Sequence, residues 1–409
     1  MHRIGVVGAG YVGLTTAACL AHLGHDVVCA DVDEAKVERL RRGEVDLVEP
    51  GLAELLEQHD IEFTTVFPHD VDFLFVCVPT PAGEHGEADL TAVHDVVAQV
   101  PENTVLVLKS TVPVGTARGI AHQPTVSNPE FLREGHAVED FLRPQRVVVG
   151  SADPEAARRV AALYGDDVPV VLTDNTTAEL IKYACNSFLA VKLSFVNSLA
   201  ELCERVGADI DGVTEGMRLD ERIGAAFLQP GPGWGGSCLP KDTRALLCTA
   251  REQDVEFATL RAAVDTNEHQ VRRIAEKVEG ERIGLLGLTF KAGTNDLRDS
   301  PALAIARLLD GDIRAYDPAI SQQVDGITVV GTPEELADGR DVLVVLTEWP
   351  EFAELDWPAL AGRMTTPVLV DTRGVVPADK VREAGFRLVS VGHRTDDGDL
   401  RRARCGDAE

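Results

Sequence analysis

Short apolar runs of strand length recur through the first part of the chain, and helix-like sequence separates several of them. Helices that alternate with buried strands predict a parallel α/β sheet covered on both faces. The strand candidates are Ile4–Val7, Asp26–Ala30, Asp72–Val78, Thr104–Leu108, Arg146–Val149 and Val168–Leu172.

The pattern changes near Thr176, where the strand-length runs give way to helical periodicity. Residues 176–179 have the sequence Thr-Thr-Ala-Glu, which fits a capping box at a helix start. The helical pattern then continues to about Arg205, and neither glycine nor proline interrupts it. Such a helix would span on the order of 45 Å. Further helical sequence runs from Lys241 to about Val278. We expect a helical middle that links two sheets and forms a subunit interface.

A second α/β section begins at Arg282. We therefore predict an α/β protein with two Rossmann-like parallel-sheet domains, joined by a long central helix and a helical middle domain. The expected boundaries are 1–175, 176–278, 279–395 and a polar tail at 396–409. The strand candidates of the second section are Arg282–Leu288, Ile313–Tyr316, Asp341–Leu346 and Val368–Val370.

Charge separates this chain from most soluble proteins. Its 409 residues include 67 acidic and 39 basic side chains, for a formal net charge of −28. Such a surface is typical of proteins that work in high salt, where screening removes self-repulsion, although an acidic protein need not come from such a source. Nucleic acid is an unsuitable partner because phosphate binding needs a basic face.

Cysteine usage and the opening residues suggest where the chain works. The eight cysteines show no paired metal-ligand spacing, so we expect reduced thiols and no metal site. The chain opens on a strand-like run without a signal peptide and contains no stretch suited to a membrane span, so we expect a cytoplasmic protein.

A glycine motif follows the first strand and opens a helix. Gly8 suits a tight turn, Gly10 lets a pyrophosphate approach the backbone, and Gly13 permits close packing of helix on strand. Asp31 ends the second strand, where a carboxylate bonds the ribose hydroxyls of NAD and repels the 2′-phosphate of NADP. Together these features predict NAD binding rather than a purely structural turn.

A second glycine-rich segment, residues 231–242, has the sequence GPGWGGSCLPKD. It places Cys238 directly before a helix start, because Pro240 suits the first helical turn. A helix N-terminus and the nearby Lys241 favour a thiolate, and Asp242 lies in reach as an acid/base partner. The alternative is a glycine-rich turn that holds an inert cysteine.

Several motifs together resemble the UDP-glucose/GDP-mannose dehydrogenase family over nearly the whole chain. They occur in the order typical of the family. The matching segments are Gly8–Gly13, 79–81, 110–116, 128–135, Lys182 with Asn186, 235–242, 290–291 and 298–301.

The resemblance implies a four-electron oxidation of the C6 alcohol of a nucleotide sugar by two NAD. It also implies an N-terminal NAD-binding domain, a homodimer through the central helix and a C-terminal nucleotide-sugar domain. Cys238 would hold the aldehyde as a thiohemiacetal and then a thioester. Lys182 and Asn186 would stabilise negative charge on oxygen, and Asp242 would act as a base. Glu130 and Thr111 would handle the hydrolytic water.

The resemblance further implies two sets of binding residues. For the four cations Arg222, Lys291, Arg298 and Arg373, the alternative interpretation is a surface ion pair. For Glu130 and Glu134 it is two solvated carboxylates. The expected NAD-binding residues are Gly8, Gly10, Tyr11, Val12, Gly13, Asp31, Lys36, Pro79, Thr80, Ser110, Thr111, Glu134 and Arg298. The expected substrate-binding residues are Glu130, Phe131, Leu132, Lys182, Asn186, Arg222 from across a dimer interface, Phe227, Gly235, Lys291 and Arg373.

The identity of the sugar nucleotide depends on finer features of these motifs. Segments 128–135 and 138–141 favour UDP-glucose, which would be converted to UDP-glucuronate, whereas the cysteine segment also fits GDP-mannose. An N-acetylated UDP-hexosamine is a third possibility. A two-electron hydroxyacid dehydrogenase would leave Cys238 and the second α/β section without a role. A non-catalytic nucleotide-sugar binding protein would not need Lys182, Asn186 and Asp242.

Overall fold

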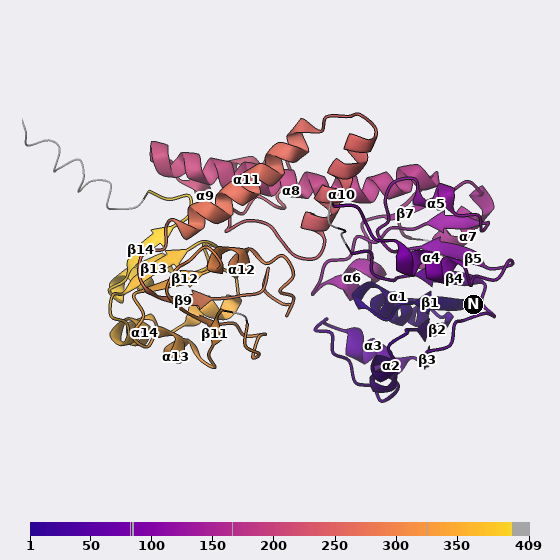
Figure 1. Ribbon diagram of the computed structural model, residues 1–409, viewed down its shortest axis with the longest axis horizontal. Coiled ribbons are helices and arrows are strands. Elements are labelled where there is room, and N and C mark those ends of the chain that lie inside the picture. Colours follow the sequence, from indigo (N-terminus) through magenta and orange to yellow (C-terminus); the bar gives the residue numbers. More distant parts are fainter. Residues whose placement is uncertain (82, 84–85, 166, 325, 395–409) are drawn as a thin grey trace, which may run out of the picture. The chain divides into compact units, whose positions relative to one another are not determined.

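The computed structural model describes residues 1–81, 83, 86–165, 167–324 and 326–394. The expected polar tail at 396–409, which includes Cys405, lies outside the described residues. The chain divides into two compact units, Met1–Cys185 with Arg244–Glu256, and Asn186–Thr243 with Phe257–Glu409. Each unit contains one β-sheet, drawn in purple for the first and in orange to yellow for the second (Figure 1).

The first unit contains an eight-stranded sheet in the order β3-β2-β1-β4-β5-β6-β7-β8. Its central strands β1, β4 and β5 are almost entirely apolar and buried, as expected for a sheet covered on both faces. The strands are β1 (Arg3–Val7), β2 (Asp26–Ala30), β3 (Ile61–Thr64), β4 (Phe73–Val76), β5 (Val105–Leu108), β6 (Thr125–Ser127), β7 (Val147–Ser151) and β8 (Val170–Thr173).

Helices connect the strands of this first sheet. Those before β8 are α1 (Tyr11–His22), α2 (Glu34–Arg41), α3 (Leu52–Gln58), α4 (Thr91–Val97), α5 (Thr116–Gly119), α6 (Ala137–Leu142), α7 (Pro154–Ala161) and the 3-10 turn η1 (Ala162–Tyr164).

The second unit contains a six-stranded sheet in the order β11-β10-β9-β12-β13-β14, with every neighbouring pair parallel. Its strands are β9 (Arg282–Leu286), β10 (Asp312–Tyr316), β11 (Thr328–Val329), β12 (Val342–Val345), β13 (Val368–Asp371) and β14 (Arg387–Ser390). Its helices are α12 (Pro301–Ala306), α13 (Pro333–Ala337), η2 (Pro350–Glu354), α14 (Trp357–Arg363) and α15 (Ala378–Glu383).

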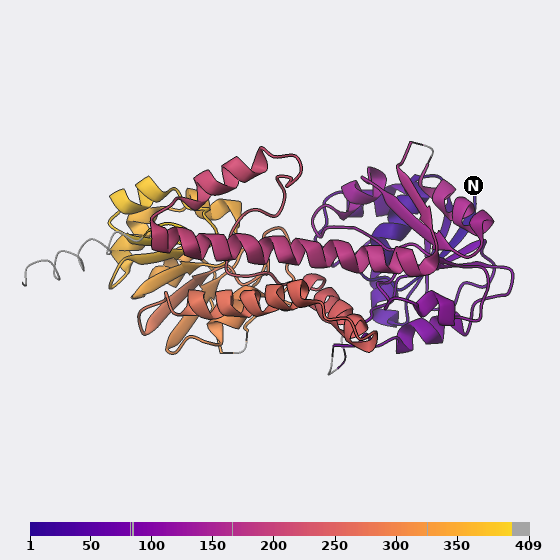
Figure 2. The same ribbon diagram turned by 90° about the horizontal axis from the view of Figure 1, so that it is seen from above.

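Four helices lie between the two sheets in sequence: α8 (Asn175–Val206), α9 (Ile210–Arg218), α10 (Leu239–Glu252) and α11 (Ala258–Ala275). Figure 2 shows α8 as one uninterrupted helix, and it has 32 residues. Among the residues that the structure describes, no helix combines the length and apolar character needed to cross a membrane. The predicted fold class is therefore confirmed, with two parallel-sheet α/β domains and a long helix between them.

The structure corrects three details of the sequence-based prediction. First, β6 and β7 pair antiparallel within an otherwise parallel sheet. Second, the strands β3, β6, β11 and β14 were not predicted, because they are edge strands, very short, or interrupted by polar residues.

Third, the capping box at Thr176 is wrong. The helix α8 already begins at Asn175. The cap is Asp174, whose carboxylate accepts hydrogen bonds from the Thr177 N–H at 3.0 Å and from its hydroxyl at 2.6 Å. The side chain of Glu179 therefore does not cap the helix and instead accepts hydrogen bonds from the Gly115 and Ala117 N–H groups, which are distant in sequence.

Candidate functional site

The glycine turn after β1 has the steric features of a dinucleotide-binding loop. A Cβ atom on Gly13 would lie 1.7 Å from the Gly8 carbonyl oxygen, and one on Gly8 would lie 2.7 Å from the Cys77 carbonyl oxygen. At Gly10, by contrast, a Cβ would meet nothing within 4 Å. Two glycines thus permit the tight turn, whereas Gly10 leaves open space beside the N-terminus of α1, where a pyrophosphate binds in such loops.

Asp31 follows β2 and faces this turn. Its carboxylate accepts hydrogen bonds from the Ala9 N–H at 2.8 Å, the Asp33 N–H at 3.0 Å and the Lys36 ammonium at 2.9 Å. Burial would raise the pKa of Asp31, but these hydrogen bonds outweigh burial and lower it. The carboxylate therefore stays ionised near neutral pH and is a suitable acceptor for ribose hydroxyls. The donor and acceptor set fits NAD.

The next two expected cofactor loops contact each other. The Thr80 hydroxyl donates to the Thr111 carbonyl at 2.8 Å, and the Ser110 hydroxyl donates to the Val78 carbonyl at 2.7 Å. Pro79 lies between these contacts in the chain. Hydrogen bonds therefore connect the loops after β4 and β5 at the carboxyl edge of the sheet, where open α/β sheets bind ligands.

Lys182 and Glu130 form a buried ion pair. The Lys182 ammonium lies 2.8 Å from a Glu130 oxygen, and the side chains are only 4% and 7% exposed. The other Glu130 oxygen accepts the Leu132 N–H at 2.6 Å. Burial would raise the pKa of Glu130, but the charge and hydrogen bond of Lys182 lower it. The pair brings together two expected catalytic residues from α8 and from the segment after β6.

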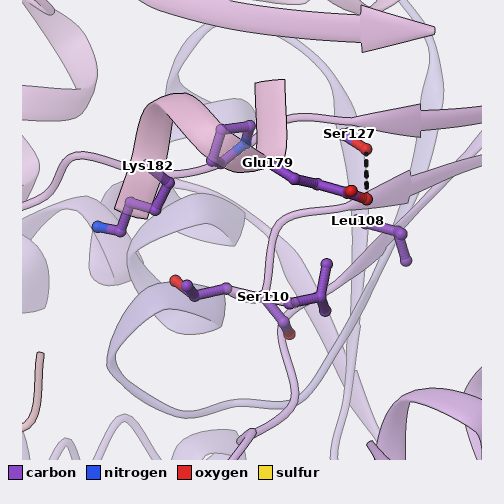
Figure 3. A pocket seen from close by; sticks show the side chains of 8 residues that line it. Leu108, Ser110, Ser127, Glu179 and Lys182 are labelled. Atoms are coloured by element: carbon purple, nitrogen blue, oxygen red, sulfur yellow. Dashed lines mark hydrogen bonds between the residues drawn. The ribbon is translucent and has the colours of Figure 1, made fainter. Parts of the chain in front are cut away.

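Lys182 also lines a small pocket of the first unit. Lys182, Thr111 and Ser110 contribute to its walls together with Glu179 (Figure 3). Glu179 is 3% exposed, and burial raises its pKa against the opposing effect of hydrogen bonds from Ala117 and Gly115. The pocket therefore combines a cation, hydroxyls and a buried carboxylate within the first unit.

Cys238 occupies the N-terminal boundary of α10, as predicted. Its carbonyl accepts the Asp242 N–H at 2.9 Å, the first turn of the helix, and its side chain is exposed. Neighbouring atoms leave no room for a side chain at the two glycines before it. A Cβ on Gly235 would lie 2.0 Å from the Asp299 carbonyl oxygen, and one on Gly236 would lie 2.7 Å from the ring of Phe290. The exposed thiol is thus set on a sterically fixed loop beside a helix N-terminus.

Asp242 is buried below the thiol-bearing turn and is held from two sides. The Asn186 amide donates to one carboxylate oxygen at 2.6 Å, and the Lys241 ammonium lies 2.6 Å from the other. The structure thus joins Asn186 with Asp242, as the expected roles require. The Lys241 charge, which we expected to act on the thiol, is instead paired with Asp242.

Expected substrate residues of the second unit lie around the C-terminal sheet. Arg373 follows β13 and donates to the carbonyls of Leu346 at 2.9 Å and Phe290 at 3.2 Å. The Lys291 ammonium lies 5.5 Å from the centre of the Phe290 ring. Arg298, which was expected to bind NAD, forms a bidentate pair with Asp296, with hydrogen bonds of 2.7 to 3.0 Å. Arg373 and Lys291 thus both contact the Phe290 segment.

The loop with Arg222 and Phe227 is strained and tethered. Phe227 has φ +61, a left-handed conformation that is unusual for an aromatic residue and often marks a functional site. The Lys192 ammonium holds the loop through the carbonyls of Ile223, Gly224 and Ala226 at 2.5 to 3.3 Å. Arg222 itself is exposed and pairs with Asp220 at 2.6 Å.

Sequence reasoning missed three buried residues that shape the first unit. Glu49 accepts from the Tyr11 hydroxyl, from the Gly135 N–H at 2.7 Å and from the Val138 N–H at 3.3 Å, so it links the glycine turn to the segment of Glu134. Lys109 donates to Asn128 at 3.2 Å and Tyr164 at 3.0 Å. Glu179 was assigned to a cap. The only signal was a charged residue next to a motif or an apolar run, which is common on surfaces too.

Comparison with known proteins gives a consistent result. Three models of the UDP-glucose/GDP-mannose dehydrogenase family match: the NAD binding domain at 2–167, the central domain at 176–269 and the UDP binding domain at 284–378. The chain is 42% identical to UDP-glucose 6-dehydrogenase of Rhizobium meliloti (strain 1021), covering 95% of this chain and 99% of that one. It is 39% identical to UDP-glucose 6-dehydrogenase TuaD of Bacillus subtilis (strain 168), covering 96% and 93%.

A solved structure extends the similarity to the fold. The UDP-glucose dehydrogenase of the hyperthermophilic archaeon Pyrobaculum islandicum superposes with a TM-score of 0.88 at 35% identity, covering 96% of this chain and 98% of that chain. The sequence and structural comparisons therefore agree over nearly the full length.

Proposed function

Because this chain belongs to the UDP-glucose/GDP-mannose dehydrogenase family, we propose that it oxidises the C6 alcohol of UDP-glucose to the carboxylate of UDP-glucuronate with two NAD. The observation that carries the proposal is the exposed Cys238 at the start of α10. A thiol is needed because the intermediate aldehyde must be held for a second oxidation. NAD supplies the hydride acceptor in both oxidations.

The first oxidation removes a hydride from C6 and the proton of the alcohol. The Asp242–Asn186 pair is the proposed acceptor system, with Asp242 as base or as the group that holds a water. Lys182 is the proposed stabiliser of negative charge on the sugar oxygen. Its ion pair with Glu130 keeps the ammonium in place.

The second oxidation starts when the Cys238 thiolate adds to the aldehyde carbon and the oxygen takes up a proton. Loss of a second hydride and of that proton leaves a thioester. Water then adds to the thioester carbonyl, the C–S bond breaks and its electron pair leaves with Sγ. The sum is one alcohol, two NAD and one water giving one carboxylate, two NADH and three protons. We propose Glu130 and Thr111 for orienting the water.

Binding of the nucleotide sugar is proposed for the second unit. Lys291 and Arg373 supply cations suited to a diphosphate, and both contact the Phe290 segment. Phe227 and Gly235 are proposed to contact the sugar. Glu130, Phe131 and Leu132 are proposed as further substrate-binding residues. Tyr11, Val12, Lys36 and Arg298 are proposed as further NAD contacts.

We propose a homodimer that forms through α8. This helix exposes Phe188, Phe195 and Leu202 at seven-residue intervals, with exposed fractions of 64%, 55% and 53%. Such a stripe costs free energy in water and is typical of a helix that packs on a partner. Phe195→Glu should convert the dimer to a monomer in light scattering, whereas Leu308→Glu, another exposed leucine, should not. A monomeric wild-type chain would overturn the dimer proposal.

The test of the reaction is the NADH yield for each UDP-glucose consumed. Two NADH and one UDP-glucuronate are expected. Cys238→Ala should form no acid while NAD binding persists, and Cys248→Ala on the same helix is the matched control that should keep the yield of two. One NADH from the wild type, or acid from Cys238→Ala, would overturn the thioester route. GDP-mannose and N-acetylated UDP-sugars, supplied in parallel, should give much lower kcat/KM.

A further inference from the structure

Glu179 is a buried carboxylate of α8 whose contacts are not explained by helix formation. It accepts hydrogen bonds from the Gly115 N–H at 2.6 Å, the Ala117 N–H at 3.0 Å and the Ser127 hydroxyl at 3.3 Å. Both carboxylate oxygens are used, and the dashed line in Figure 3 marks the contact with Ser127. A buried carboxylate with three donors holds those donors in position. If the carboxylate moved away, the buried N–H groups would lack an acceptor, which costs free energy.

One of these partners, Gly115, belongs to the loop that joins β5 to α5, residues 109–115, and a second, Ala117, lies in α5 directly after it. Gly115 ends this loop with φ +96, a conformation that glycine adopts readily and other residues do not. On its other side the loop is fastened by the Thr80 hydroxyl, which donates to the Thr111 carbonyl at 2.8 Å. Thr111 therefore lies on a short segment that is held at one end by Thr80 and at the other by Glu179.

The same helix contributes a second charged group to the lining of the pocket. Lys182 lies three residues after Glu179 on α8 and forms its ion pair with Glu130 at 2.8 Å. Glu179, Thr111 and Lys182 all line the one pocket. One helical turn thus fixes two loops that are far apart in sequence: Glu179 holds the Thr111 loop, and Lys182 holds Glu130.

We propose that Glu179 is a positioning residue for hydrolysis of the thioester, because it fixes Thr111 relative to the Lys182–Glu130 pair between which the water is oriented. The proposal rests on the proposed function. In this step the water oxygen bonds to the carbonyl carbon, the C–S bond breaks with its electron pair on Sγ, and two protons leave for solvent. Glu179 touches none of the reacting atoms.

The proposal requires a carboxylate at this position rather than only a polar side chain. In Glu179→Gln, one oxygen becomes an amide nitrogen, which places a donor opposite the N–H of Gly115 or of Ala117. The loop must then shift, and misplacement of a catalytic group by about 1 Å can cost about 100-fold in rate. The hydride transfers depend on Cys238, Asp242, Asn186 and Lys182, none of which bonds to Glu179 in the contacts given above.

The experiment is rapid-mix kinetics on Glu179→Gln, with intact-mass spectrometry of the quenched protein. We expect a burst of two NADH for each active site, then a steady state slowed about 10- to 100-fold. A covalent UDP-glucuronyl adduct on Cys238 should accumulate, while KM for NAD and UDP-glucose stays within about twofold. Ser127→Ala, which removes one donor of the three, should slow the same step less.

Thr104→Val is the control for a purely structural effect. Thr104 is buried in the same unit, and its hydroxyl donates to the Val71 carbonyl at 3.1 Å, a group that is not bonded to Glu179 or its three donors. The variant should lower the Tm and leave no adduct. If Glu179→Gln behaves like Thr104→Val, or slows every step equally, the positioning role is overturned. Should Glu179→Gln fail to fold, Ser127→Ala without an adduct would overturn it.

The wild type, run in parallel, separates this result from failure of the proposed function. A wild-type yield of one NADH would refute the thioester route itself. A yield of two NADH with no adduct in Glu179→Gln would refute only the role of Glu179.

Discussion

The first and last α/β regions share an arrangement of a strand, a glycine and an aspartate, which we call the strand–glycine–aspartate frame, but its surroundings differ. In both sheets, a strand runs into a glycine with a left-handed φ, Gly8 or Gly287, whose N–H donates at 2.8 Å to the end of the neighbouring strand. In both, an aspartate follows that neighbouring strand and accepts backbone N–H groups from just after the glycine. Asp31 binds Ala9 at 2.8 Å, and Asp317 binds Leu288 at 2.7 Å.

The regions diverge immediately after this shared turn. In the first, α1 begins at Tyr11, and the open space at Gly10 lies beside its N-terminus. In the second, α12 does not begin until Pro301, and the intervening segment includes Phe290 and Asp299, which crowd the glycines before Cys238. The surroundings of the aspartates differ as well. Asp31 has a lysine partner, whereas Asp317 is 3% exposed and accepts the Thr289 N–H, the Thr289 hydroxyl and the Trp349 ring N–H.

The comparison teaches that the strand–glycine–aspartate frame does not define a dinucleotide site. A helix must start directly after an open glycine, and the aspartate must keep acceptor capacity for a ligand. The last region has neither feature, so its aspartate serves the fold.

The sharpest way to break this comparison is Gly13→Ala. The added Cβ would overlap the Gly8 carbonyl at 1.7 Å, so α1 must move away from the turn. We expect a loss of about 3 kcal/mol in the free energy of unfolding and loss of NAD binding. Chemical denaturation and an NAD fluorescence titration would measure both. Gly10→Ala is the matched control, because it should keep stability and weaken only NAD binding; equal stability in both variants would contradict the steric argument.

Asp317→Asn tests the structural role of the second aspartate. An amide nitrogen facing N–H donors leaves a buried donor without an acceptor, at a cost of about 2 kcal/mol. We expect a lower Tm, measured by calorimetry, with KM for NAD unchanged. A rise in that KM at unchanged Tm would mean that the second aspartate also serves the dinucleotide.

Asp31→Asn is the reciprocal change in the first region. Loss of charge weakens the bonds to the ribose hydroxyls and frees Lys36, so we expect KM for NAD to rise about tenfold, or about 1.4 kcal/mol, with a smaller effect on Tm. Steady-state kinetics at saturating UDP-glucose would measure it. If the Tm falls as far as in Asp317→Asn, the two aspartates have equivalent roles and the comparison fails.

The smallest expected effect is a difference in titration. Burial would raise the pKa of Asp31, but its hydrogen bonds outweigh burial and lower the pKa. At the end of β13, burial raises the pKa of Asp371 despite N–H donors from Arg373, Val376 and Gly374. Asp31 contributes stability that is present above its unfolded pKa and is lost as pH falls through its lower folded pKa. Asp371 contributes stability that is present below its unfolded pKa and is lost as pH rises through its higher folded pKa.

Carboxyl NMR of aspartate-labelled protein would follow both groups between neutral and acidic pH. On acidification Asp371 should take up its proton before Asp31. The reverse order would contradict the opposite environments assigned to the two strand ends.

The sequence predicts the parts of this molecule that depend on local pattern. The buried central strands are recognisable as apolar runs, and β2 was predicted with its observed ends. The glycine turn and the cysteine before α10 are recognisable because steric need restricts residue type over a few positions. Edge strands such as β3 escape prediction because one side stays polar, as at Glu62.

What the sequence could not predict depends on contacts between distant segments. Glu179 fits a local cap, yet its partners Gly115 and Ala117 lie more than sixty residues away. The sequence predicted that the Lys241 ammonium would stabilise the Cys238 thiolate, yet the ammonium forms an ion pair with the adjacent carboxylate of Asp242. In both cases the choice among competing partners follows from tertiary packing, which propensity and spacing do not encode.

The lack of room for a side chain at Gly235 has a consequence for how this protein can change over time. With the Asp299 carbonyl 2.0 Å from any added Cβ, no side chain fits at position 235 unless residues near 299 move as well. Mutations in these two segments are therefore coupled and should survive only as compensating pairs. A saturation library of both segments should recover double substitutions whose single counterparts are inactive. The residues near 299 in the C-terminal domain can therefore vary only in ways that keep Cys238 in position.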